Sequence, residues 1–220
     1  MTSPIEREGN RAGQSPGPSS GSNHIVYLHG FRSSPLSFKA RLIQRRMSEL
    51  GLGDHYACPQ LPASPSAAIA IGRALADRHA VDRILLIGSS LGGYYATWLA
   101  EKLGCRAVLL NPGVFAARDL AAHVGRHTMY HSTEPFELLP AHVEELKAFA
   151  VARITRPERY FLVAATGDEL LDWREMVAHY AGARQLVIQG SDHGLSDFAN
   201  HLDDVLEFCG IESNNHRGEH

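Results

Sequence analysis

The stretch Gly88-Ser89-Ser90-Leu91-Gly92 decides the fold, because of what stands on either side of it. Residues 84–87 before it are continuously apolar and predict a buried strand, whereas residues 94–103 after it predict a helix. A G-x-S-x-G pattern between a strand and a helix is typical of a nucleophile elbow, a sharp turn that presents a serine. We therefore predict that Ser90 is an activated nucleophile.

The two glycines of this stretch have a steric role in the predicted turn. A side chain at position 88 or 92 would collide with the turn, and glycine has no Cβ to collide. The serine at the apex is expected in a strained backbone conformation, as is common at functional sites. The Oγ of Ser90 would then stand above the edge of the sheet, with the N–H of Leu91 pointing into the same space.

The composition is that of an ordinary globular chain and excludes several classes of protein. Of the 220 residues, 44% are hydrophobic and 20% are charged, which suits one domain with a sizeable core. The net charge of −3 leaves no basic footprint for nucleic acid. No apolar stretch approaches the ~18 residues of a membrane span. The first residues also lack the basic and then apolar order of a signal peptide.

The cysteines indicate a reducing compartment. Cys58, Cys105 and Cys209 are odd in number and widely spaced, which argues against a disulfide framework or a zinc site. We expect them to be small buried hydrophobic residues. The prediction is a cytoplasmic protein with reduced thiols, and its oligomeric state stays open.

Strands alternate with helices along most of the chain, between two polar ends. Residues 1–23 and 212–220 are predicted to be disordered tails, which leaves one folded domain over residues 24–211. Continuously apolar strands suit a sheet covered by helices on both faces. The pattern predicts a doubly wound, mostly parallel α/β sheet of about six strands. The expected strands are residues 24–28, 56–58, 84–87, 107–110, 160–165 and 185–188, and the expected helices are residues 36–50, 67–79, 94–103, 141–150, 172–180 and 198–208.

Residues 113–156 interrupt this alternation, because the segment is too long for a single crossover. It contains Pro135 and Pro140, the expected helix at 141–150 and several histidines. An insertion after the carboxyl end of a strand lies over the site in such sheets. We therefore predict a small cap insertion here.

A nucleophilic serine needs a base, and the base needs an orienting carboxylate. With an elbow the chain order is serine, acid and then histidine, each after a strand. His193 follows the late strand at 185–188 and is the candidate base. Asp168 follows the strand at 160–165 and is the candidate acid. Glu169 and Asp172 compete with it, because a one-residue error in the register would exchange their roles. Asp192, beside the histidine, is expected to be a loop residue.

An oxyanion hole requires two convergent donors. The N–H of Leu91 is one candidate, and the N–H of Phe31, in the loop after the strand at 24–28, is the other. His29 precedes the serine, which is the wrong chain order for a base, so we expect a structural role. Arg32 is expected to be solvated at the surface, with an anionic group of a substrate as its alternative partner.

These stretches together resemble the α/β-hydrolase family, and more closely the YqiA-like (UPF0227) group of small bacterial esterases. The resemblance covers nearly the whole folded domain and occurs in the expected order. It implies the α/β-hydrolase fold and esterase or thioesterase activity, with Ser90, Asp168 and His193 as a catalytic triad and no cofactor. The matching stretches are residues 27–31 with 33–35, residues 88–94, residues 110–112, residues 166–169 and residues 190–193.

Two other functions remain open from the sequence. The same triad would also serve cleavage of an amide, a lactone or a carbon–carbon bond, because fold alone does not choose the bond. A binding protein that keeps the fold and its pocket is the non-enzymatic alternative. The expected partner is a small acyl ester or thioester, with no nucleic acid and no membrane span.

A metal site is the third alternative. His123, His127 and His131 recur every four residues, which would align them along one helix face. Gly125 weakens such a helix, and ligands eight residues apart lie ~12 Å from each other along it. We therefore expect a polar face of the cap and no metal.

Overall fold

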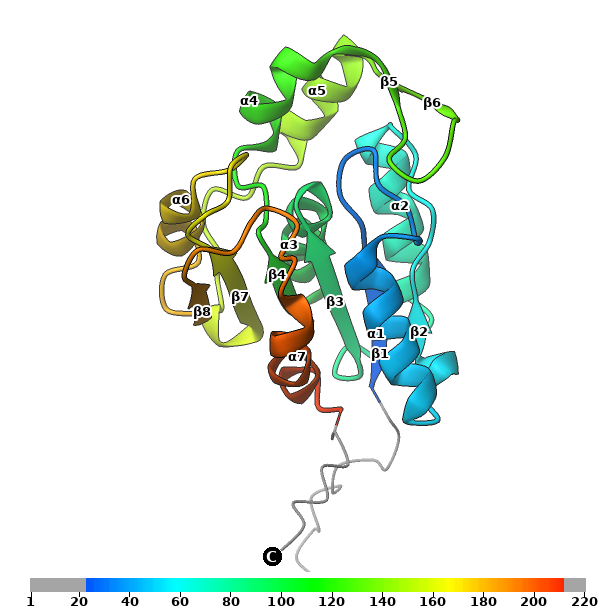
Figure 1. Cartoon of the computed structure of the whole chain (residues 1–220), viewed down its shortest axis with the longest axis vertical. Coiled ribbons are helices and arrows are strands. Elements are labelled where there is room, and N and C mark those ends of the chain that lie inside the picture. The colour runs from blue at the N-terminus through cyan, green and yellow to red at the C-terminus, as the bar shows by residue number, and fades with distance from the viewer. Residues whose placement is uncertain (1–22, 212–220) are drawn as a thin grey trace, which may run out of the picture.

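The computed structural model describes residues 23–211, so the predicted tail residues 1–22 and 212–220 lie outside the described part. Six parallel strands form one sheet in the order β2-β1-β3-β4-β7-β8 (Figure 1). This arrangement confirms the predicted doubly wound α/β fold. The strands are β1 (His24–Leu28), β2 (Tyr56–Ala57), β3 (Ile84–Ser89), β4 (Arg106–Leu110), β7 (Tyr160–Ala165) and β8 (Arg184–Ile188).

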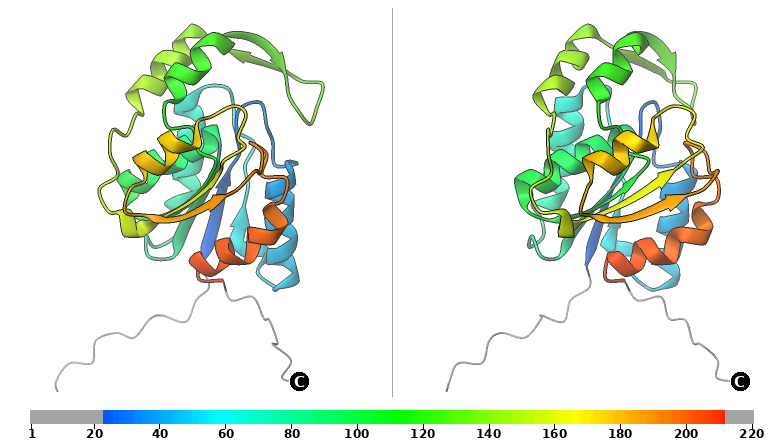
Figure 2. Two further views of the ribbon diagram at one scale, coloured as in Figure 1. Left: turned by 60° about the vertical axis from the view of Figure 1, so that its left-hand side comes forward. Right: turned by 90° about the vertical axis from the view of Figure 1, so that its left-hand side faces the viewer.

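Helices cover both faces of the sheet (Figure 2). One face packs against α1 (Phe38–Glu49) and α7 (Leu202–Phe208), and the other packs against α2 (Pro65–Ala76), α3 (Leu91–Leu103) and α6 (Trp173–His179). Central strands therefore have no exposed face, and all six residues of β3 and of β7 are buried. Short 3-10 turns complete this part of the chain: η1 (Gly53–His55), η3 (Pro157–Arg159) and η4 (Phe198–His201).

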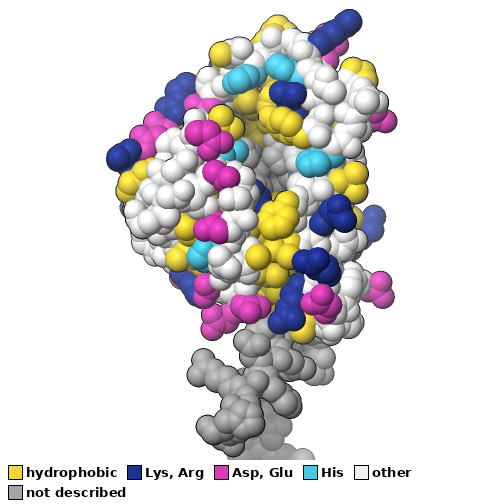
Figure 3. All heavy atoms as spheres, viewed as in Figure 1, with side chains coloured by type: hydrophobic (Ala, Val, Ile, Leu, Met, Phe, Trp, Pro, Cys, Tyr) yellow, Lys and Arg dark blue, Asp and Glu magenta, His cyan; other side chains and the backbone are white. Residues whose placement is uncertain are grey.

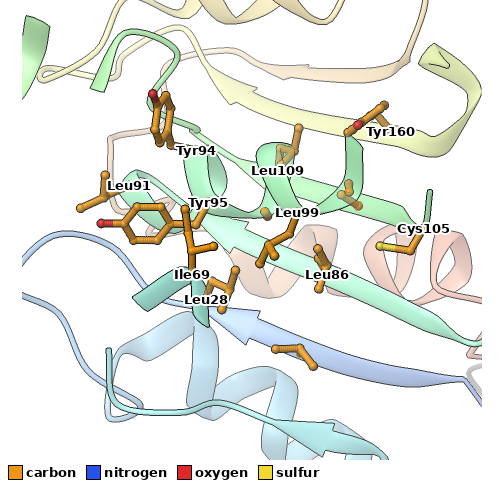
Figure 4. Packing of buried hydrophobic residues seen from close by; sticks show 14 of the residues in the cluster. Leu28, Ile69, Leu86, Leu91, Tyr94, Tyr95, Leu99, Cys105, Leu109 and Tyr160 are labelled. Carbon is orange, nitrogen blue, oxygen red and sulfur yellow. The ribbon is translucent and has the colours of Figure 1, made fainter. Parts of the chain in front are cut away.

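The core on the α2 and α3 face supports the turn that carries Ser90. Leu28 of β1 and Leu86 of β3 pack against Ile69 of α2 and Leu99 of α3 (Figure 4). Leu99 is fully buried. Burying apolar side chains of this size contributes about 1.5–3 kcal/mol each, so the start of α3 is held firmly against the sheet.

The β4–β7 segment, residues 111–156 before η3, forms a separate set of elements. It comprises α4 (Ala116–Leu120), η2 (Ala121–His123), β5 (Gly125–Thr128), β6 (Pro135–Leu138) and α5 (Pro140–Ala148). Figure 1 shows these elements beyond the end of the sheet toward which the β3 arrow points. Phe136, Leu138 and Val143 form their small apolar core.

The three histidines of this segment do not lie along one helix, which was the arrangement that the metal alternative required. β5 and β6 pair as an antiparallel hairpin, with His127 opposite Phe136. Gly125 has a φ of 132°, a conformation that ends helical geometry before the hairpin begins. Within residues 23–211, no group of three or more His, Cys, Asp or Glu side chains is arranged to hold a metal ion.

A membrane-crossing helix is absent from residues 23–211, where none combines the required length with the required apolar character.

Candidate active site

Ser90 occupies the strained turn that the sequence predicts. Its φ of 54° and ψ of −121° are unusual for a residue with a side chain. A Cβ at Gly92 would lie 1.9 Å from the carbonyl oxygen of Leu28, and one at Gly88 would lie 2.3 Å from that of Gly92. The turn is also bonded to the neighbouring strand, since Ser90 N–H donates to Leu110 O at 3.1 Å. These contacts hold the strained serine in place.

The ring of His193 bridges Ser90 and Asp168. His193 Nε2 lies 3.0 Å from Ser90 Oγ, and Nδ1 lies 2.8 Å from Asp168 Oδ2. A carboxylate accepts from Nδ1–H, which leaves Nε2 free to accept from the hydroxyl of the serine. The side chain of Asp168 is fully buried, whereas that of His193 is 17% exposed. The structure thus brings together the three side chains that the sequence selects.

The turn after β7 aims the carboxylate of Asp168 at this ring. Its second oxygen, Oδ1, accepts from Leu170 N at 2.9 Å and from Leu171 N at 2.8 Å. These two bonds fix the carboxylate plane, so that Oδ2 faces His193. Gly167 permits the close passage of the next loop, because a Cβ there would lie 2.6 Å from Ser191 O.

The competing acids have other partners. Glu169 accepts from the backbone N–H of His193 at 3.0 Å, so it supports the histidine loop and not the ring. Asp172 caps the first turn of α6 by accepting from Arg174 N at 2.9 Å. Asp192 accepts from Ser196 N at 2.9 Å, within its own loop.

Asn111 is a site residue to which the sequence reasoning gave no role. Its side chain is 1% exposed and donates to the carbonyls of Asp192 at 3.0 Å and His193 at 3.1 Å. Its Oδ1 accepts from Ala165 N at 2.8 Å. Asn111 therefore joins the ends of β4 and β7 to the histidine loop. The available signal was a polar residue directly after a buried strand, in the Leu110-Asn111-Pro112 stretch.

The two candidate oxyanion donors come from the start of α3 and from the loop after β1. Leu91 is the first residue of α3, where a backbone N–H has no preceding helical turn to accept it. Phe31 follows Gly30, which approaches the serine so closely that a Cβ would lie 3.1 Å from Ser90 Cβ. The ring of Phe31 packs edge-on against Phe136 of β6, at 5.1 Å between centroids.

His29 has the structural role expected of it. The residue is 3% exposed, and its Nε2 accepts from Leu61 N at 3.0 Å while Nδ1–H donates to Gly30 O at 3.1 Å. Burial lowers the pKa of His29 below its usual value, since a charged ring would lose its hydration there. The neutral ring thus fixes the loop that carries Phe31.

The family of the chain follows from a match over nearly all of its described length. A model of the uncharacterised protein family UPF0227 matches residues 24–210. The chain belongs to the UPF0227 family. This membership confirms the resemblance drawn from the sequence.

Solved structures share the fold of this UPF0227 chain. The mouse alpha/beta hydrolase domain-containing protein 10 is 16% identical, with 86% of this chain and 91% of that chain covered and a TM-score of 0.64. One of the metagenome-derived lipolytic enzymes LipS and LipT is 18% identical, with 88% and 96% covered and a TM-score of 0.66. Est1E from Butyrivibrio proteoclasticus, with ferulic acid bound, is 11% identical, with 89% and 92% covered and a TM-score of 0.63. The UPF0227 chain has the α/β-hydrolase fold.

A cavity of about 380 Å³ opens in this UPF0227 chain between the sheet and the β4–β7 segment. Figure 3 shows the surface hollowed there. Ser90 and His193 both line the cavity, so the serine hydroxyl is open to a small molecule. Its other lining residues include Phe31, Arg32, Lys39 and Tyr130. The volume suits a ligand of small to medium size.

Proposed function

We propose that this chain is a serine hydrolase of acyl esters or acyl thioesters that works through an acyl-enzyme intermediate. One observation carries the proposal: the ring of His193 stands between Ser90 Oγ, at 3.0 Å, and the buried carboxylate of Asp168, at 2.8 Å. A serine is a weak nucleophile until an adjacent base takes its proton. These distances are those that such a proton transfer requires.

The reaction would proceed in two halves. His193 takes the hydroxyl proton as Ser90 attacks the carbonyl carbon, and then returns that proton to the leaving alcohol or thiol. Water enters, gives its proton to the same nitrogen and attacks the acyl group, which leaves as a carboxylic acid while Ser90 recovers its proton. Asp168 holds the ring in the productive tautomer and offsets its transient positive charge.

The charge that develops on the carbonyl oxygen needs fixed donors. In the proposed site the N–H groups of Leu91 and Phe31 converge on that oxygen. Preorganised donors of this kind are worth about 10²–10³ in kcat each. Their support here is positional: Leu91 directly follows the serine at a helix start, and Phe31 follows Gly30, where an added Cβ would lie 3.1 Å from Ser90 Cβ.

Size favours esters over peptides. A cavity of about 380 Å³ suits a small to medium acyl group, whereas a peptide needs an extended groove to align it. Amides are also harder to cleave, because the leaving amine must be protonated in good alignment.

A substrate panel tests the proposal on wild type, Ser90→Ala and Ser48→Ala. The panel contains p-nitrophenyl esters, acyl thioesters, lactones and peptide anilides. We expect turnover of esters or thioesters in wild type and in Ser48→Ala, which alters an exposed serine on α1, and none in Ser90→Ala. A serine-reactive phosphonate should label Ser90 and not Ser89.

Three outcomes would overturn the proposal. Full activity in Ser90→Ala would remove the nucleophile. Anilide or lactone turnover well above ester turnover would assign the site to another bond. A stably bound ligand with no turnover of any substrate would favour the binding protein.

A further inference from the structure

Lys39 of α1 is a buried cation in the wall of the candidate active site. The residue is 8% exposed and lines the same cavity as Ser90 and His193. Its Nζ donates one hydrogen bond, to the carbonyl oxygen of Gly194 at 2.5 Å. Gly194 follows His193 directly, so the ammonium lies beside the loop of the proposed base.

Two of the three donors of this ammonium have no acceptor among the protein atoms of residues 23–211. Among residues 23–211, Lys39 Nζ has no second hydrogen-bond acceptor and no carboxylate within 4.0 Å. Burial lowers the pKa of Lys39 to about 8, against the opposing attraction of Asp192 and Asp168 at longer range. The side chain therefore stays mostly charged at neutral pH, and a buried charge without a counter-ion in contact is unfavourable. A ligand that supplies an anionic oxygen would satisfy both donors.

The charge of the cavity wall supports an anionic ligand. Arg32 also lines the cavity, with its Nε bonded to Thr128 O at 2.8 Å and its guanidinium 4.6 Å from the ring centroid of Tyr130. Asp119 lines the cavity as well, but it is paired with Arg118 Nε at 2.7 Å. The charges of the cavity wall that have no oppositely charged group in direct contact, within the described part of the chain, are therefore the two cations, Lys39 and Arg32.

We propose that the substrate carries a carboxylate on its leaving alcohol or thiol, and that Lys39 binds this carboxylate. The inference rests on the proposed function, because it extends the same site. The leaving group lies on the side of His193, which must protonate it, and Lys39 is bonded to the next residue in the chain. Lys39 is thus a specificity-determining residue.

The test compares matched ester pairs on wild type, Lys39→Met, Lys39→Arg and Lys102→Met. The first pair is the butyryl ester of 4-hydroxybenzoate and that of 4-hydroxybenzamide, which differ in a charge on the leaving group. The second pair is p-nitrophenyl hydrogen adipate and its primary amide, which differ in a charge on the acyl group. Lys102→Met removes an equal charge from an exposed site on α3.

We expect Lys39→Met to lower kcat/KM for the benzoate ester about 10–100-fold relative to the benzamide ester, the loss of a charge-assisted hydrogen bond. Lys39→Arg should restore much of this preference, and Lys102→Met should leave it unchanged. Taking the ratio within each pair cancels any general loss of activity. Independently of any variant, 4-hydroxybenzoate should inhibit wild type more strongly than 4-hydroxybenzamide.

Each contrary result has a distinct meaning. An equal loss for both members of the first pair would overturn the inference and leave Lys39 as a positioning residue for the His193 loop. A selective loss confined to the adipate pair would overturn the assignment to the leaving group. Failure of wild type to hydrolyse any of the four esters would instead reject the proposed function itself.

Discussion

The side-chain amide of Asn111 donates a hydrogen bond of 3.1 Å to the carbonyl oxygen of His193, from the end of a different strand. β4 ends one residue before Asn111, whereas His193 lies in the loop after β8. The bond therefore spans β7, the strand that separates them in the sheet. The position of the histidine ring is set by the order of the sheet as much as by its own loop.

Replacing Asn111 should therefore affect both stability and turnover. Asn111→Gly removes three hydrogen bonds and leaves buried groups such as Ala165 N–H without a partner, at about 1–3 kcal/mol for each unsatisfied group. We expect the free energy of unfolding to fall by about 2–4 kcal/mol, measured by urea denaturation, and kcat to fall more than KM changes. Asn111→Ala should cost about 1 kcal/mol more, because the backbone there has a φ of 42°. Wild-type stability in both variants would contradict this role.

Replacing the three candidate acids should lower kcat to different extents, as their different contacts predict. Asp168→Asn should lower kcat about 10³–10⁴-fold, since the amide no longer selects the tautomer of His193 that accepts from the serine. Glu169→Gln keeps an acceptor for the His193 N–H, and Asp172→Asn keeps a helix cap, so both should lower kcat far less. Steady-state kinetics on one good ester suffice. A larger loss in either control than in Asp168→Asn would move the acid to another residue.

The strain at Ser90 should be measurable in inactive variants. A non-glycine residue in such a conformation costs about 1–3 kcal/mol, and glycine adopts it freely. Ser90→Gly should therefore be more stable than Ser90→Ala by about 1–2 kcal/mol in denaturant titrations. At Gln44, an exposed residue in the middle of α1, replacement by glycine and by alanine should show the opposite order, because glycine weakens a helix interior by about 1 kcal/mol. The same order at both positions would show that the turn stores no strain.

Lys39 should lower the free energy of unfolding at neutral pH, because its charge is buried in the cavity wall. Its pKa falls from 10.5 to about 8 on folding, so between these values the unfolded chain binds more protons and stability rises with pH. Below about pH 8 the burial penalty is present in full, at about 3 kcal/mol. Lys39→Met loses the Gly194 bond, worth about 1 kcal/mol, and should unfold at a free energy about 2 kcal/mol higher at pH 7.

This advantage of Lys39→Met should shrink between about pH 8 and 10.5 and then reverse. Urea titrations of both proteins over that range measure the difference. A difference that does not change with pH would show that burial leaves the titration of Lys39 unaltered.

The sequence predicts the sheet well because buried strands leave an unambiguous pattern. Residues 160–165 are continuously apolar and form β7, every residue of which is buried. The sequence defines the acid less sharply, because Asp168, Glu169 and Asp172 all follow this strand. The choice depends on the turn, in which Leu170 N and Leu171 N hold one oxygen of Asp168. Such a turn is specified by backbone geometry that a single sequence does not display.

Two features could not be predicted from the sequence, for physical reasons. The histidines at positions 123 and 127 repeat with a helical period, but His123 ends the 3-10 turn η2 and His127 lies on β5 of a hairpin whose strands pair with each other. Lys39 sits in a helix whose Phe38 is 53% exposed while Lys39 itself is 8% exposed. The hydrophobic pattern predicts a buried Phe38 and an exposed Lys39, because the pattern carries no information on the polar loop at 190–194 that approaches this face of α1.

β8 is an edge strand that pairs with β7 alone, and only Ile188 of its five residues is buried. Local opening of such a strand costs less free energy than unfolding of the core. Because His193 is carried by the loop after β8, detachment of this strand would withdraw the proposed base while β1, β3 and β4 stay paired. In a urea titration, turnover would then be lost with a midpoint of its own, at a lower urea concentration than the midpoint of global unfolding. Amide hydrogen exchange in β8 should run faster than in β3, and at a rate that tracks the reversible loss of turnover.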